Sequence, residues 1–284
     1  MITISRLRLL ALLTTILALG FAAGQSRIVS LSGDATEILF GLGAQENIVA
    51  VDATSNYPAE ANELPNVGYH GQLSAEGLFA FDPTHVIVNS SAGPEDVLSQ
   101  LEDSGVEIVR LAEDLSLETP IENIRLVAEL VGEEERGEEL AQELQEKFDT
   151  AAQQAAEFEE QPRVLFLYLG STRMQFAGGD ETASNVMIEG AGAIDVGKEV
   201  GFVGNVPFTP EAVVTANPNV LLVTERGLNT MGSIDAILEI PGIAQTPAAE
   251  QGNVIVFEDL YLLGMGPRSG DALLELVEQL HDMQ

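Results

Sequence analysis

The sequence predicts an α/β protein made of two βα lobes that are joined by one long helix, with a ligand cleft between the lobes. Short apolar strands alternate with helices toward both ends of the chain, an order that is typical of parallel βαβ units. The middle stretch, 121–160, has helical periodicity and no strand pattern. A short cassette also occurs twice, with an offset of 135 residues, which indicates two similar lobes. Two lobes on one strut form a clamp, and ligands bind preferentially where two domains meet.

The N-terminal segment, 1–24, has the features of a cleaved export signal. Arg6 and Arg8 precede an uncharged apolar run, 9–23, and the small residues at 22–24 offer a cleavage point. A membrane anchor is the alternative, but the run is shorter than the ~20 residues that a spanning helix needs. We therefore expect a mature protein that is exported to the periplasm and is not inserted in the membrane.

The chain is strongly acidic and contains no cysteine. Of its 284 residues, 45 are Asp or Glu and 12 are Lys or Arg, which gives a net charge of −33. Such a surface repels nucleic acid and anionic membranes, so the charge excludes both as partners. Without cysteine the chain has no disulfide and no residue that could carry a lipid, and its stability must come from core packing. The few basic residues are therefore informative.

The N-terminal lobe is expected to span 25–120. Apolar runs bounded by turn residues predict its strands, and helical spacing predicts the helices between them. The expected strands are 27–31, 48–52, 86–89 and 106–111, and the expected helices are 35–42 and 94–104.

The connecting segment, 121–160, is expected to be the long helix. Apolar residues recur in it at helical spacing, and the sequence after Gly132 is rich in Glu, Gln and Ala, which are strong helix formers. A helix of about 28 residues would be roughly 40 Å long at 1.5 Å per residue. That length suits a rigid strut between two lobes.

The C-terminal lobe is expected to span 161–284 and to repeat the βα order of the first. The expected strands are 164–169, 220–224 and 254–257, and the expected helices are 183–189, 211–216, 234–238 and 270–281.

The repeated cassette consists of a capping residue, a glutamate, a short helix, a proline and a strand. It reads Ser74, Glu76 and Pro83 in the first half, and Thr209, Glu211 and Pro218 in the second. Ser and Thr are favoured at a helix N-cap, and a glutamate in the first turn is stabilised by the helix dipole. Helix stability alone is thus a sufficient reason for both glutamates.

No catalytic constellation is present in the sequence. There is no cysteine, the three histidines are scattered, and neither GxGxxG nor a Walker A loop occurs. The same scatter of histidines disfavours a zinc or manganese carrier. We therefore expect a binding protein rather than an enzyme.

Four stretches of the chain resemble the periplasmic haem-binding proteins of ABC importers. They are Leu64-Pro-Asn-Val-Gly-Tyr69 with Gln72-Leu-Ser-Ala-Glu-Gly77, Thr224-Glu-Arg-Gly-Leu228, Pro241-Gly242 with Thr246-Pro-Ala248, and Leu262-Leu-Gly-Met-Gly-Pro-Arg268. Apart from the stretch around Tyr69, they are shared with the wider class that binds vitamin B12 and siderophores. The resemblance implies two Rossmann-like lobes joined by one long helix, and a monomer that captures haem and delivers it to an ABC permease.

The resemblance implies that Tyr69 is the axial ligand of ferric haem iron. A phenolate is a hard anionic donor that suits Fe(III). Members of the family often carry Arg two residues after this tyrosine, where this chain has Gly71, so the expected stabiliser of the phenolate is missing. His70 is a second candidate ligand, although we expect it to be a surface residue, because neighbours in an extended loop point opposite ways.

The two propionates of haem require positive charge. Arg226 and Arg173 each follow a predicted strand of the second lobe, and ligands of open α/β sheets lie at the carboxyl ends of the strands. We expect these two arginines to contact the propionates. Arg268 is expected to cap or brace the last helix.

The resemblance also gives Glu76 and Glu211 a second role, in which they dock on arginines of the permease. A pair of equivalent glutamates suits a two-fold permease dimer, and this role is compatible with helix stabilisation. The rival ligands for the same fold are a corrinoid and a ferric siderophore. The absence of Trp and the Gly68-Tyr69 motif favour haem over a corrinoid.

Overall fold

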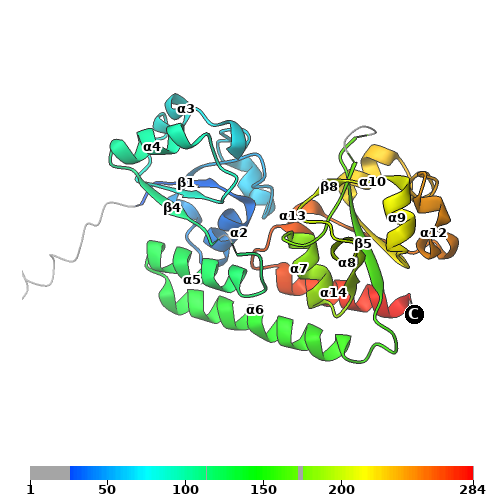
Figure 1. The fold of residues 1–284 in the computed structure, drawn as a ribbon. Coiled ribbons are helices and arrows are strands. Elements are labelled where there is room, and N and C mark those ends of the chain that lie inside the picture. Colours follow the sequence, from blue (N-terminus) through cyan, green and yellow to red (C-terminus); the bar gives the residue numbers. More distant parts are fainter. Residues whose placement is uncertain (1–25, 113, 172–174, 284) are drawn as a thin grey trace, which may run out of the picture.

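The computed structural model describes residues 26–112, 114–171 and 175–283, which form two lobes above a pair of helices (Figure 1). Within these ranges, no helix is both long enough and apolar enough to cross a membrane. The predicted leader, 1–24, lies outside the described residues. The predicted α/β class with two lobes is confirmed.

The first lobe is built on a four-stranded parallel sheet with the strand order β2-β1-β3-β4. Its strands are β1 (Ile28–Leu31), β2 (Ile48–Val51), β3 (His85–Val88) and β4 (Glu107–Arg110). Its helices are α2 (Gly33–Gly41), α3 (Ala75–Phe79) and α4 (Glu95–Asp103), with 3-10 turns η2 (Gln45–Asn47), η3 (Ala59–Glu63) and η4 (His70–Gln72). All four residues of β1 are buried, as expected of a central parallel strand that is covered on both faces.

The second lobe is built on a six-stranded mixed sheet with the order β10-β9-β5-β6-β8, in which β7 also pairs with β5. Its strands are β5 (Arg163–Leu169), β6 (Gln175–Ala177), β7 (Ile194–Asp195), β8 (Val206–Pro207), β9 (Val220–Thr224) and β10 (Val254–Phe257). The pairs β5–β6 and β6–β8 are antiparallel. The short strands β6, β7 and β8 are absent from the expected strands, because strands of two or three residues carry too few apolar positions to be recognised.

The helices of the second lobe follow the strands. They are α7 (Ala183–Gly190), α8 (Val196–Glu199), α9 (Pro210–Ala216), α10 (Glu225–Met231), α11 (Ile234–Leu238), η5 (Ile243–Gln245), α12 (Pro247–Gln251), α13 (Asp259–Leu263) and α14 (Ser269–Asp282). Two of them, α10 and α13, start directly after β9 and β10 and so bring side chains to the carboxyl ends of these strands.

The connecting segment is a pair of helices rather than one helix over 121–160. α5 (Thr119–Val131) ends at Gly132, whose φ of 75° terminates the helix in the left-handed conformation. The long helix is α6 (Glu134–Ala155), which has 22 residues and packs against both α5 and α14. Figure 1 shows α6 running beneath both lobes, so it does serve as the strut that the sequence predicts, in a shorter form.

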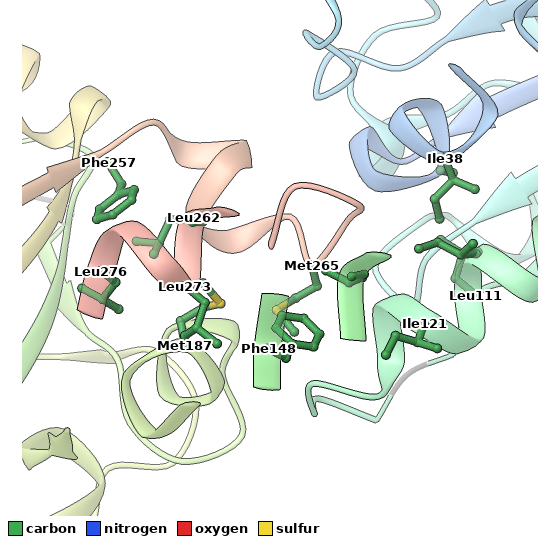
Figure 2. Packing of buried hydrophobic residues seen from close by; sticks show 14 of the residues in the cluster. Ile38, Leu111, Ile121, Phe148, Met187, Phe257, Leu262, Met265, Leu273 and Leu276 are labelled. Atoms are coloured by element: carbon green, nitrogen blue, oxygen red, sulfur yellow. The ribbon is translucent and has the colours of Figure 1, made fainter. Parts of the chain in front are cut away.

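One continuous apolar cluster joins the two lobes. It extends from Ile38 on α2 to Leu276 on α14. Figure 2 shows Phe148 of α6 and Met265 between the side chains of the first lobe and those of the second. Because this core is shared, opening the lobes widely would expose buried apolar surface, so the cleft is expected to change its width only modestly.

The repeated cassette has the same conformation in both lobes. Ser74 caps α3 by accepting a bond from the backbone N–H of Gly77, and Thr209 caps α9 by accepting one from Ala212. Asp82 and Asn217 both have a φ of 48°. The predicted N-caps are confirmed, and the offset of 135 residues therefore describes a structural repeat.

Candidate functional site

A cavity of about 460 Å³ lies between the lobes. Its walls come from the ends of strands in both sheets, where parallel strands present loops to a ligand. Residues after β1, β2, β3 and β4 form one wall, and Tyr168 of β5 with residues that follow β9 and β10 form the other. Apolar side chains cover much of the interior, contributed by Leu111, Leu115, Leu260, Leu263 and Met265. The predicted cleft between the lobes is thus present.

Tyr69 lines this cavity, and 52% of its surface is exposed. The loop that carries it is tied to the end of β2. The N–H of Val67 donates to the carbonyl of Val51 at 2.9 Å, and the N–H of Ala53 donates to the carbonyl of Gly68 at 2.8 Å. An exposed tyrosine on a tethered loop is available to a ligand without any rearrangement of the backbone.

His70 is buried, with 6% of its surface exposed, and the expectation of a surface residue is wrong. Its Nδ1 lies 2.7 Å from Oδ2 of Asp52, and its Nε2 lies 3.0 Å from Oγ of Ser91. The chain does not continue straight after Tyr69 but turns into η4, so the two neighbouring rings lie together, with centroids 4.3 Å apart. His70 therefore supports Tyr69 from behind, and both of its ring nitrogens already have protein partners.

Asp52 anchors this arrangement. Its side chain is fully buried, and its oxygens accept hydrogen bonds from the hydroxyl groups of Thr54 and Ser55 as well as facing His70. Several donors compensate for the burial of a carboxylate. The sequence analysis missed both Asp52 and Ser91. The position of Asp52, directly after a buried strand, is the signal that could have identified it.

Gly71 lies against the ring of Tyr69. A Cβ atom at this position would come within 2.8 Å of Cε1 of Tyr69. A larger residue here would push the tyrosine ring out of its present orientation. The glycine at position 71 is therefore linked to the way in which the ring of Tyr69 lies over His70.

Arg226 lies on α10 at the opposite wall of the cavity, as expected for a residue that follows a strand. Its side chain is 67% exposed, and its Nε lies 3.5 Å from a carboxylate oxygen of Asp259. A guanidinium that is so weakly held can turn toward an anionic ligand. The structure thus brings Tyr69 and Arg226 to one cavity, while Arg173, the other predicted arginine, lies outside the described residues.

Arg268 connects the lobes next to the cavity. Its Nε lies 3.0 Å and its Nη2 lies 2.5 Å from the two carboxylate oxygens of Glu37 on α2. Its guanidinium also stacks on the ring of Tyr57, 3.5 Å from the centroid. Burial raises the pKa of Glu37, while the bond from Arg268 opposes that shift. Arg268 is the N-cap residue of α14 but makes no side-chain cap, so it braces this helix against α2 rather than capping it.

Asp34 is another acidic residue that the sequence analysis missed, and it lines the cavity. It lies in the first turn of α2, and the hydroxyl of Ser32 donates to its Oδ1. Burial raises the pKa of Asp34 to about 6, with hydrogen bonds from Ser32 and the backbone acting in the opposite direction. This carboxyl group is therefore partly protonated in mildly acidic solution.

Glu76 and Glu211 are exposed and lie outside the cavity, in the first turns of α3 and α9. Within the described residues, no group of three or more His, Asp or Glu side chains is arranged to hold a metal ion. The cavity thus combines apolar and polar lining residues, with the phenol of Tyr69 on one wall and the loosely paired guanidinium of Arg226 on the other.

Comparison with known proteins agrees with this geometry. The profile of the family described as "Periplasmic binding protein" matches residues 28–260. The structure is similar to the apo form of the periplasmic heme-binding protein RhuT from Roseiflexus sp. RS-1, with a TM-score of 0.88 and 45% identity over 92% of this chain and 99% of that chain. It is also similar to the heme-binding protein BhuT in complex with two hemes, with a TM-score of 0.87 and 33% identity over 92% and 99% of the two chains.

A curated relative points to a different ligand. The vitamin B12-binding protein of Photorhabdus laumondii is 24% identical over 263 residues, which cover 92% of this chain and 90% of that protein. Both kinds of relative are substrate-binding proteins and not enzymes.

Proposed function

Because the chain belongs to the periplasmic binding protein family, we propose that it captures haem in the periplasm and delivers it to the permease of an ABC importer. The observation that carries the proposal is the exposed Tyr69 in a partly apolar cavity between two lobes, in a chain 45% identical to a heme-binding protein. Haem is a flat, mostly apolar ligand with a Lewis-acidic iron and two carboxylates, and these features match the chemistry of the cavity walls.

In this proposal Tyr69 binds the iron through its phenolate oxygen. Tyrosine is one of the residue types that ligate haem iron, and an anionic oxygen suits the ferric state. A phenol ionises near pH ~10 in water, so the bond to iron must favour the deprotonated form. His70 does not compete for the iron, because its nitrogens are bonded to Asp52 and Ser91; it holds the tyrosine ring in place.

Arg226 binds a propionate in the same proposal. Arginine pairs well with carboxylates, and this one lies at the cavity rim with only a loose partner in Asp259. Arg173 is proposed as the second propionate contact from its place in the sequence alone. In a chain of net charge −33, such local cations are needed to retain a dianionic ligand.

Delivery is proposed to use the permease-facing glutamates Glu76 and Glu211. The repeat places one of them in each lobe, in the same local structure, and a permease dimer has two equivalent subunits to receive them. In this proposal the mature protein is a monomer, and residues 1–24 are removed on export. Its lobes are 25–120 and 161–284, and the segment 121–160 connects them.

The second candidate is a corrinoid, which the similarity to vitamin B12-binding proteins favours. The ligand class is tested by titrating the protein that lacks residues 1–24 with ferric haem and, separately, with cyanocobalamin. We expect saturable binding of haem with a shifted Soret band, and no saturable binding of cyanocobalamin. Binding of the corrinoid alone would overturn the proposal in favour of this second candidate.

A further inference from the structure

The repeated cassette places an exposed apolar residue beside each of the two glutamates. Phe79 stands three positions after Glu76 on α3, and Val214 stands three positions after Glu211 on α9. Residues three apart on a helix are neighbours on its surface. Phe79 is 39% exposed and Val214 is 41% exposed, so each glutamate has an uncovered apolar neighbour.

Phe79 and Val214 occupy equivalent positions of the repeated cassette. The residue before each apolar side chain, Leu78 or Val213, is almost fully buried and holds its helix on the lobe. The offset from Phe79 to Val214 is the same 135 residues that separates the glutamates. Helix capping and the helix dipole explain a glutamate in the first turn, but they do not explain why an exposed apolar residue recurs at the same position next to it in both copies.

We propose that Phe79 and Val214 are apolar anchors of the permease-docking surface, one for each subunit of the permease dimer. This inference rests on the proposed function and assigns to its docking step two residues besides the glutamates. The partner that fits has two equivalent sites, each with a basic group for the glutamate and an apolar surface for its neighbour. Figure 1 shows α3 and α9 in different lobes, as a partner with two separate sites requires.

The two kinds of residue contribute differently to docking. A charge at the rim of an interface mainly accelerates association, because its field acts at a distance and is screened by salt. An apolar side chain acts only on contact, so its loss mainly accelerates dissociation. Phe79 has the larger side chain and is expected to contribute more than Val214.

The test measures binding of the haem-loaded protein to the permease–ATPase complex of its own importer, reconstituted in lipid nanodiscs, by biolayer interferometry at several salt concentrations. We expect Phe79→Ser to raise the dissociation rate about tenfold, and Val214→Ser to raise it by a smaller factor. Phe79→Leu retains an apolar side chain and should dissociate nearly as slowly as the wild type. Glu76→Gln with Glu211→Gln should slow association and weaken its salt dependence.

The matched control combines Leu126→Ser and Ile234→Ser, which alter apolar residues of similar exposure, 36% and 39%, outside both cassettes. This variant should behave as the wild type. Haem titration and thermal unfolding of every variant show that folding and ligand binding are intact. If the double variant with Phe79→Ser and Val214→Ser dissociates at the wild-type rate, the proposal that these two residues anchor docking is refuted. This holds even if the glutamate variants show that the glutamates take part in docking. A wild-type protein that binds haem but not the complex refutes the docking step itself and leaves haem capture standing.

Discussion

The guanidinium of Arg268 and the carboxylate of Glu37 form a two-point ion pair that joins the lobes, although the two residues are 231 positions apart in the chain. The side chain of Glu37 is only 4% exposed and that of Arg268 is 21% exposed. The pair lies next to the cavity, since Asp34 and Met265, which stand three positions before Glu37 and Arg268, line the cavity wall. It therefore helps to set the separation of the lobes at the ligand site.

Removing Arg268 leaves the carboxylate of Glu37 buried without its partner. We expect Arg268→Gln to lower the free energy of unfolding by about 3 kcal/mol, because an uncompensated buried charge is costly. Arg125→Gln is the control, since Arg125 pairs with Glu138 on the surface and its loss should cost less than about 1 kcal/mol. Urea unfolding of both variants gives the comparison. Equal losses in the two variants would mean that the interlobe pair has no special role.

Asp34 should make stability depend on pH. Burial raises its pKa in the folded protein to about 6, above the ordinary value of 3.8, so the folded state holds a proton that the unfolded state releases. Stability is therefore lost as the pH rises through this interval. Asp34→Asn removes the effect, and its advantage in unfolding free energy over the wild type should grow by about 2 kcal/mol from pH 4.5 to pH 7.5. Urea unfolding at the two pH values measures it, and a constant difference would contradict the burial of this carboxyl group.

Arg226 should affect haem affinity through the propionates and not through the iron. We expect Arg226→Gln to weaken binding of ferric haem about fivefold, with an unchanged absorption spectrum, because an exposed charged contact contributes about 1 kcal/mol. The same variant should bind haem dimethyl ester as well as the wild type does. Lys198→Gln removes a cation of the second lobe that pairs with Asp180 and Glu189, and it should have little effect. A fivefold loss that persists with the ester would show that Arg226 does not act on the propionates.

His70 should be required for stability rather than for ligation. His70→Phe keeps a ring behind Tyr69 but leaves Oδ2 of Asp52 without its partner at 2.7 Å. We expect a lower melting temperature, because the buried carboxylate of Asp52 loses one of its hydrogen-bond partners and keeps only Thr54 on Oδ2, at a cost of about 1–3 kcal/mol. The absorption spectrum of the haem complex should not change. A changed spectrum with unchanged stability would identify His70 as an iron ligand instead.

Much of the fold follows from local patterns in the sequence. The strands β9 and β10 are predicted with their observed bounds, because both are short, nearly continuous apolar runs. The break at Gly132 is missed because helix-forming residues lie on both sides of it. The local sequence does not show whether the chain turns back at such a glycine. Here it does, because α6 packs against α5.

The candidate site is predicted only in part. Tyr69 and Arg226 are found because one lies in a recognisable motif and the other follows a strand. The burial of His70 is missed because its partners, Asp52 and Ser91, lie 18 and 21 positions away and no periodic pattern links them. Contacts of this kind, like that of Arg268 with Glu37, arise from tertiary structure and not from any local signal.

The identity of the iron ligand is the central claim, and a visible-absorption titration with ferric haem tests it most directly. The wild type is compared with Tyr69→Phe and with Tyr168→Phe, which alters the tyrosine on the other wall of the same cavity. We expect the wild type and Tyr168→Phe to give the same phenolate-type spectrum, and Tyr69→Phe to lose it and to bind haem more weakly. Tight binding by Tyr69→Phe with the wild-type spectrum would contradict the claim and move the ligand elsewhere in the cavity.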